Sequence, residues 1–274
     1  MRVEIKTGEA KPFQMMLEDG KESKRAIRVS EFNWNEEGTR AIAYARATDN
    51  KDEWILAMDV DTAQGRVLYS HHDKAWVGGP GALVLGWINN EDIYFETESS
   101  GWAHLYRMSY RGGKPVALTS GPWEVQSATL MPNKKDFLLV TNEKHHGEKH
   151  AYLLSINGGL RRPLTKSTGF HEPYISPDGK MMADLFSSAN RPPEIFIQNL
   201  ETNKPPIQIT KSISNDFENR PWVVPPVLTF PARDGARVPV RLYKPAQWKA
   251  GGPAVLFIHG AGYLQNAHKG WSTY

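Results

Sequence analysis

The residues with the clearest chemical potential form a short run near the end of the sequence, His259-Gly260-Ala261-Gly262. The run follows Ala254 to Ile258, consecutive apolar residues that are typical of a strand buried on both faces. Small residues directly after such a strand let backbone N–H groups approach a substrate carbonyl, where a side chain would block them. The pattern predicts a loop that stabilises an oxyanion, and a plain glycine-rich turn is the alternative interpretation.

Ser272 is a second candidate, because Gly270-Trp271-Ser272 has the form of the start of a nucleophile elbow. However, Thr273 and Tyr274 do not supply the second glycine of Gly-x-Ser-x-Gly, and that motif occurs nowhere in the sequence. An elbow also follows a further strand and helix, which do not fit into about ten residues after the glycine-rich run. We therefore expect that Ser272 is not a nucleophile and that Trp271 and Tyr274 pack against neighbouring structure.

Two runs, His71 to Asp73 and His145 to Glu148, hold residue types that bind metals. Neither run has a spacing that places its ligands on one face, as His-Glu-x-x-His does, and the sequence contains no cysteine. Glu36 and Glu37 form an acidic pair in a run of turn residues after Trp34. We interpret all three as exposed loops or turns and predict neither a metal nor a cofactor.

The elements that must position these residues begin with a repeat. His104 to Gly113 matches His150 to Gly159 at an offset of 46, and each copy ends in Leu-Thr a few residues later. Looser copies run from Glu194 to Leu200 and from Trp54 to Tyr69. Each copy alternates apolar and polar residues around a turn that carries Gly or Asn, which predicts a β-hairpin.

A second set of segments precedes the hairpins, each with turn residues such as Pro177-Asp178-Gly179 followed by an apolar run. One unit is therefore four short strands in about 45 residues, the period of a β-propeller blade. A β-sandwich with accidental similarity is the alternative. Four blades follow a leading fragment from Val3 to Ile27, and we expect further blades to be missing upstream.

The composition changes after Thr210. Residues 212–226 are rich in Asn, Pro and charge and are typical of a linker, and residues 227–245 predict a hairpin around an Asp-Gly turn. We predict a mostly β chain: a partial β-propeller over residues 1–221, including the linker, followed by the first strands of an α/β-hydrolase domain over residues 222–274.

Taken together, a propeller, the hairpin segment from Phe230 to Gly235 and the run from Phe257 to Asn266 resemble the prolyl oligopeptidase family of serine peptidases. The bacterial members related to dipeptidyl peptidase IV and acylaminoacyl peptidase are most similar. The resemblance is weak over the blades and strong over residues 227–274. It implies that the propeller admits only peptides and that a Ser-Asp-His triad, absent from this sequence, cleaves them.

The same resemblance implies roles for the glycine-rich run. The backbone N–H groups of Gly260 and Ala261 would help to hold the oxyanion. His259 stands where dipeptidyl peptidase IV has a Tyr, so it either donates a hydrogen bond or caps the strand. The acidic pair of that enzyme would fall around Ser23-Lys24 rather than at Glu36 and Glu37, which leaves dipeptidyl specificity unsupported.

Charge and hydropathy narrow the partners. The net charge is +3, and basic and acidic residues are interleaved along the sequence. The sequence therefore has no basic stripe of the kind that indicates nucleic-acid binding. No apolar run reaches the ~18 residues that cross a bilayer. We expect the intact parent to be a serine peptidase of short peptides and this chain alone to be inactive. A non-enzymatic protein-binding propeller is the alternative. The sequence does not decide between a periplasmic, secreted or cytoplasmic location, nor whether the intact protein forms a homo-oligomer.

Overall fold

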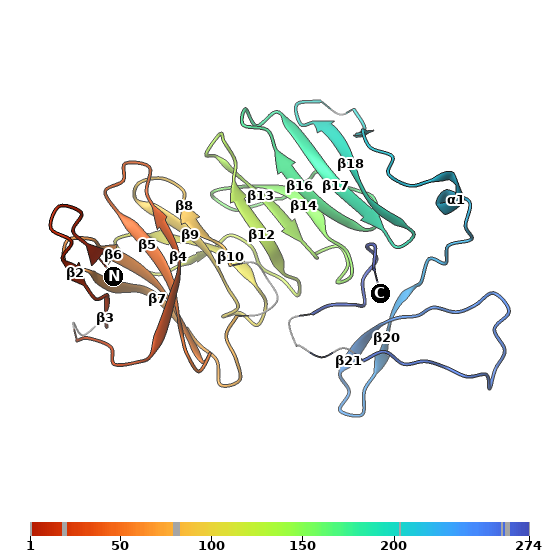
Figure 1. Ribbon diagram of the computed structural model, residues 1–274, viewed down its shortest axis with the longest axis horizontal. Helices are drawn as coiled ribbons and strands as arrows, with labels where there is room; N and C mark the ends of the chain where they lie inside the picture. Colours follow the sequence, from red (N-terminus) through yellow and green to blue (C-terminus); the bar gives the residue numbers. More distant parts are fainter. Residues whose placement is uncertain are drawn as a thin grey trace. The chain divides into compact units, whose positions relative to one another are not determined.

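The structure is a computed structural model that describes residues 2–17, 21–78, 83–202, 204–258, 260 and 264–273. Nearly all regular structure in these residues is β (Figure 1). The chain divides into two compact units, one of Met1–Ala128 with Ile156–Gly159 and one of Thr129–Ser155 with Leu160–Tyr274. Each unit is held together by sheets in which nearly all neighbouring strands are antiparallel and follow one another along the chain.

The first unit opens with a two-stranded sheet of β1 (Arg2–Val3) and β2 (Ala10–Lys11). A five-stranded sheet follows, in the order β3-β7-β6-β5-β4. Its strands are β3 (Gln14–Met16), β4 (Ile27–Trp34), β5 (Ala41–Ala47), β6 (Asp52–Asp59) and β7 (Gln64–His72). Strands β4 to β7 form an antiparallel meander, and β3 joins it by parallel pairing with β7.

Both faces of the central strands β5 and β6 are buried, which explains their nearly continuous apolar sequences. Ile42 and Ile55 lie in a core cluster that continues to Ile93 and Phe95 of the next sheet. Ala45 belongs to a second cluster, on the other side of the strand, with Met15 and Trp54. Alternate residues of a strand point to opposite faces, so the two clusters sandwich the sheet.

The second sheet of this unit has the order β11-β10-β9-β8. Its strands are β8 (Leu85–Trp87), β9 (Asp92–Thr97), β10 (His104–Ser109) and β11 (Val116–Ala117). The β10–β11 turn contains Gly112 and Gly113 with φ of 104° and 111°. Residues with a side chain rarely adopt these values, so this turn depends on glycine.

Two further four-stranded sheets run in chain order, β12-β13-β14-β15 and β16-β17-β18-β19 (Figure 1). The first contains β12 (Val125–Leu130), β13 (Asp136–Thr141), β14 (His150–Ser155) and β15 (Arg162–Pro163). The second contains β16 (Phe170–Ile175), β17 (Met181–Ser188), β18 (Arg191–Asn199) and β19 (Ile207–Gln208). The four predicted repeat units thus correspond to four sheets, and the predicted mostly β fold with propeller blades is confirmed.

The repeat also has a common hydrogen-bond pattern. At the start of β10 and β14, the buried rings of His104 and His150 contact Thr119 and Thr165, with Nδ1–Oγ1 distances of 3.0 and 3.2 Å. Each threonine Oγ1 also accepts a 3.0 Å hydrogen bond from the backbone N–H of the residue after the histidine. The Leu-Thr ending of each sequence copy is therefore a buried contact that closes its hairpin.

The segment after the sheets contains little regular structure. Helix α1 (Asn215–Glu218) is capped by Ser214, whose side chain accepts from the backbone N–H of Phe217. The predicted hairpin is present as β20 (Val227–Pro231) and β21 (Arg237–Arg241). The boundary between the propeller and a hydrolase domain near residue 221 stays a prediction.

The expectation of a buried strand from Ala254 to Ile258 is wrong for this structure. These residues have no regular structure, and the side chains of Val255 and Ile258 are 99% and 79% exposed. A continuous apolar run predicts a doubly buried strand only where sheet neighbours and covering helices exist. The described part of the chain provides neither around this run.

Candidate functional site

Of the four predicted oxyanion-loop residues, the structure describes Gly260. His259, Ala261 and Gly262 lie outside the described residues. Gly260 is exposed and in irregular structure, and a Cβ placed on it would have no heavy atom within 4 Å. Neither Ile258 nor Gly260 lies in a helix or in a blade. The assignment of an oxyanion loop to this run therefore stays a prediction.

The segment from Gln265 to Trp271, which follows this run, is docked on the sheets of the second unit. The backbone N–H of Lys269 donates to the carbonyl of Gly147 over 2.8 Å, and the N–H of Trp271 donates to Ser187 Oγ over 3.3 Å. Ala267 is buried. We call residues 265–271 the docked segment; it lies against the loop before β14 and the facing ends of β16 and β17.

Ring contacts extend this docking. The ring of His268 lies 4.8 Å from that of Phe170 between centroids, and the adjacent Gly270 is buried. A Cβ on Gly270 would come within 2.4 Å of the Phe170 ring, so the close approach depends on glycine. Trp271 lies 5.7 and 5.6 Å from the rings of Phe217 and Trp222. Ser272 thus follows an anchored aromatic residue.

A buried ion pair lies at the centre of the docked segment. Lys269 Nζ is 2.8 Å from Glu148 Oε1, and His150 Nε2 is 2.7 Å from Glu148 Oε2. The Glu148 side chain is only 4% exposed, whereas that of Lys269 is 26% exposed. Burial favours a raised pKa for Glu148, but the hydrogen bonds from His150 and Lys269 outweigh it, so the pKa is lowered and the carboxylate stays charged.

Burial favours the neutral form of the histidines near this ion pair. Burial lowers the pKa of His150 despite its contact with Glu148. His145 and His146 stack with their ring centroids 4.3 Å apart, and burial lowers the pKa of both. Burial, together with the charge of Arg241, lowers the pKa of His268 to about 4.

The two histidine-containing runs differ from the expected exposed loops. His71 and His72 form the end of strand β7, and His72 Nδ1 lies 2.8 Å from Asp52 Oδ1. Glu148 is buried and pairs with Lys269 of the docked segment. In both places the sequence shows the polar residues themselves, but it does not show which residue from another part of the chain pairs with them. Among the residues that the structure describes, no group of three or more His, Asp or Glu side chains is arranged to hold a metal ion.

Glu36 and Glu37 lie in an exposed turn after β4, as predicted. The turn is held by Asn35, whose Oδ1 accepts from the backbone N–H groups of Thr39 and Arg40 over 2.9 and 2.8 Å. This is an Asx-type turn that leaves the two carboxylates in solvent.

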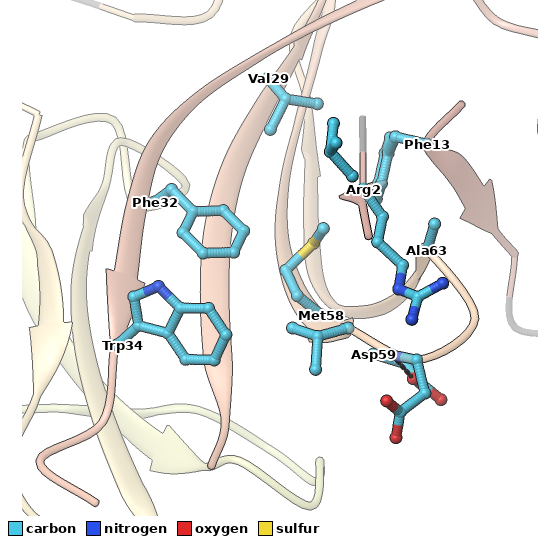
Figure 2. A pocket seen from close by; sticks show the side chains of 11 residues that line it. Arg2, Phe13, Val29, Phe32, Trp34, Met58, Asp59 and Ala63 are labelled. Carbon is cyan, nitrogen blue, oxygen red and sulfur yellow. Dashed lines mark hydrogen bonds between the residues drawn. The ribbon is translucent and has the colours of Figure 1, made fainter. Parts of the chain in front are cut away.

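An apolar groove of about 710 Å³ lies on the first unit (Figure 2). Val29, Phe32 and Trp34 of strand β4 line one side, and Phe13 and Met58 line the other. Figure 2 shows Phe32 and Trp34 next to each other, and their ring centroids are 5.7 Å apart in an edge-to-face arrangement. The groove could hold an apolar side chain or an apolar surface of another segment.

A β-bulge aligns the three side chains of β4 in this groove. Val29 and Phe32 are three positions apart, so a regular strand would place them on opposite faces. The pairing of β4 with β5 shifts between Ser30 and Phe32, and the intervening Glu31 has φ of 47°. The extra residue brings Val29 to the same face as Phe32 and Trp34.

The first unit also buries a group of carboxylates. Glu53 accepts from Tyr44 Oη over 2.8 Å and from Thr97 Oγ1 over 3.2 Å. Glu96 Oε2 is buried without a hydrogen-bond partner among the described residues. Burial, and then the nearby carboxylates of Glu98, Glu124 and Glu53, raise the pKa of Glu96 to about 9, so this side chain is protonated at neutral pH.

The repeated four-stranded antiparallel sheets define the chain as a β-propeller region. Residues 3–193 match the family model described as the dipeptidyl peptidase IV (DPP IV) N-terminal region. Because this match covers more than half of the chain, the chain belongs to that family, and its resemblance to the prolyl oligopeptidase family is confirmed.

Curated relatives agree with this assignment. The chain is 27% identical to dipeptidyl peptidase 4 of Trichophyton equinum and to that of Trichophyton rubrum, over 69% of this chain and 25% of each relative. It is 28% identical to a probable dipeptidyl peptidase 4 of Aspergillus fumigatus, over 61% of this chain and 22% of the relative. The chain thus spans about a quarter of the length of these relatives. In its described part, no helix is long and apolar enough to cross a membrane.

Proposed function

We propose that this chain is the propeller and the beginning of the catalytic domain of a serine peptidase that acts on short peptides. The observation that carries the proposal is the combination of a propeller region of the dipeptidyl peptidase IV family with the run His259 to Gly262 after it. The backbone N–H groups of Gly260 and Ala261 would stabilise the oxyanion, and the blades would restrict access to peptides.

The names of the relatives suggest the form of this activity. Dipeptidyl peptidase activity removes two residues from the N-terminus of a peptide, so the substrate needs a free terminal amine. Residues outside this sequence would supply the catalytic Ser, Asp and His, because the sequence contains no Gly-x-Ser-x-Gly motif. The chain alone would therefore bind peptides without cleaving them.

A longer protein that contains this sequence, expressed from its gene, tests the proposal. We expect it to release p-nitroaniline from Ala-Pro-p-nitroanilide and not from the same compound with a blocked amine. Cleavage of the blocked compound at an equal rate would contradict dipeptide release, and cleavage of neither would contradict the peptidase assignment. The 274-residue chain should not react with a fluorophosphonate probe, and labelling at Ser272 would refute the dismissal of that residue as a nucleophile.

The apolar groove favours a second function, that of a protein-binding propeller. Its lining residues Phe32 and Trp34 are 47% and 49% exposed. Aromatic side chains are enriched at protein interfaces, so their exposure here favours a binding surface. Isothermal titration of the chain with peptides compares the two functions. If Phe32→Asp leaves the binding of short peptides unchanged, the result supports the peptidase function. If the substitution abolishes binding, the result supports the groove as the interaction site.

A further inference from the structure

The docked segment is fixed by contacts of several kinds within seven residues. The Lys269 backbone pairs with Gly147, its side chain pairs with buried Glu148, and the rings of His268 and Trp271 lie against aromatic side chains. A surface lysine pair is normally worth little, because solvent screens it. Here the carboxylate partner is 4% exposed, so the loss of Lys269 would leave a buried charge with fewer partners.

The remaining partners of Glu148 do not replace Lys269. His150 occupies Oε2, and Lys144 Nζ is 3.7 Å from that same oxygen. Oε1 is paired with Lys269. The loop of residues 145–148 is itself ordered by a hydrogen bond from the backbone N–H of Gly147 to His145 Nδ1 over 2.9 Å. The blade thus presents a preformed acceptor to which the docked segment binds.

Along the chain, the docked segment begins three positions after Gly262, the last residue of the predicted oxyanion loop, and Lys269 lies seven positions after Gly262. A segment anchored so near to a loop limits where that loop can lie, since each residue extends at most about 3.5 Å. Oxyanion donors act only when they are held in place before the reaction. We propose that Lys269 is a positioning residue for the peptidase: through Glu148, the propeller fixes the segment that follows the oxyanion loop.

This role rests on the proposed function, but its physical part can be measured in the 274-residue chain. Lys269→Met keeps the aliphatic stem and removes the charge. We expect backbone amides of residues 267–271 to exchange with deuterium at least about tenfold faster in this variant, while amides of β13 and β14 exchange as before. The matched control is Lys180→Met, because Lys180 pairs at 3.7 Å with an exposed Glu201 and lies outside the docked segment.

A second variant tests the same contact from the blade. A Cβ on Gly147 would lie 2.9 Å from the carbonyl oxygen of Ala267 and 3.1 Å from the Cα of His268. Gly147→Ala should therefore displace the docked segment and accelerate the same amides. Unchanged exchange in both Lys269→Met and Gly147→Ala would overturn the proposal that this contact anchors the segment.

The positioning role is tested in the longer, active protein. Lys269→Met should lower kcat about tenfold or more with KM within about twofold, and Lys269→Arg should recover most of kcat because it restores the ion pair. Faster exchange with an unchanged kcat would overturn the positioning role and leave the peptidase assignment intact. An inactive wild-type protein would overturn the proposed function and, with it, the catalytic part of this inference, while the exchange data would still decide whether Lys269 anchors the segment.

Discussion

The threonine that closes each hairpin offers a test of how the repeat stabilises the fold, and Thr165→Val is the sharpest perturbation. His150 Nε2 donates to the Glu148 carboxylate, so Nδ1 is the acceptor of the Thr165 hydroxyl proton. Thr165 Oγ1 in turn accepts from the backbone N–H of Ala151. Valine has nearly the same shape and removes both hydrogen bonds without opening a cavity.

The expected cost follows from the burial of the two groups left behind. Ala151 is fully buried and His150 is 1% exposed, so water cannot replace the hydroxyl. An unsatisfied buried donor or acceptor costs about 1–3 kcal/mol, and two of them give an expected loss of about 2–6 kcal/mol in the free energy of unfolding. For a chain of this size, that corresponds to a decrease in Tm of roughly 4–24 °C.

The repeat supplies matched comparisons. Thr119→Val breaks the same pair of hydrogen bonds, to His104 and to the backbone N–H of Leu105, and should cost about as much. Thr210 makes the third copy of the backbone contact, to the N–H of Ile195, but Ile195 is 39% exposed. Water can satisfy that N–H, so the loss of this contact should cost about 1 kcal/mol or less. Thr210→Val also removes the hydrogen bond from the Thr210 hydroxyl to the buried Glu194 carboxylate, which Ser212 continues to contact.

Differential scanning fluorimetry gives the change in Tm, and hydrogen exchange gives its location. The amide of Ala151 should lose protection in Thr165→Val, whereas the amide of Leu105 should not. If Thr165→Val and Thr119→Val each lose less than about 1 kcal/mol, the reasoning that these threonines satisfy otherwise orphaned buried groups is refuted. A loss of stability without loss of protection at Ala151 would also refute it.

Two further predictions concern pH. The folded-state pKa of Glu96, about 9, lies above its ordinary value of 4.5, so the unfolding free energy should fall as pH rises from 4.5 to 9. Glu96→Gln should remove this dependence of the unfolding free energy on pH. In urea titrations at pH 8, we expect the variant to be more stable than the original chain by about 1–3 kcal/mol. The pKa of His268, about 4, lies below its ordinary 6.5, so stability should be complete above pH 6.5 and be lost as pH falls towards 4. His268→Phe should reduce that acid loss by about 1–2 kcal/mol after allowance for solvent screening, and an unchanged acid limb would contradict the assignment.

The blades could be predicted from the sequence because their determinants are local. Alternating apolar residues specify each strand, and turn residues such as Gly112 and Gly158, with φ of 104° and 80°, mark where the chain must reverse. The offset of 46 between His104 and His150 predicted that two hairpins are equivalent, and the structure gives both rings the same threonine contact. The periodicity of the sequence therefore predicted the hairpins. It also marked the positions of a polar contact inside them, although the contact itself was not predicted.

The features that escaped prediction depend on residues far apart in the sequence. Strand β3 joins its sheet by parallel pairing with β7, and Lys269 pairs with Glu148 across 121 positions. No local pattern encodes such a partner. The prediction of a buried strand before His259 was wrong for a related reason. The apolar composition of this run is typical of a strand between sheet neighbours, and the described part of the chain does not contain those neighbours. The oxyanion-loop prediction itself, apart from Gly260, falls outside the described residues.

The bulge at Glu31 has a consequence for the behaviour of the protein at high concentration. Strand β4 lies at the edge of its sheet and carries exposed apolar side chains, a combination that invites another chain to add a strand and start a fibril. Glu31 interrupts the regular spacing of backbone hydrogen-bonding groups and places a charge in the middle of the strand. An incoming strand could pair only with the short stretches on either side, so the same residue that assembles an apolar groove also protects the edge against sheet extension.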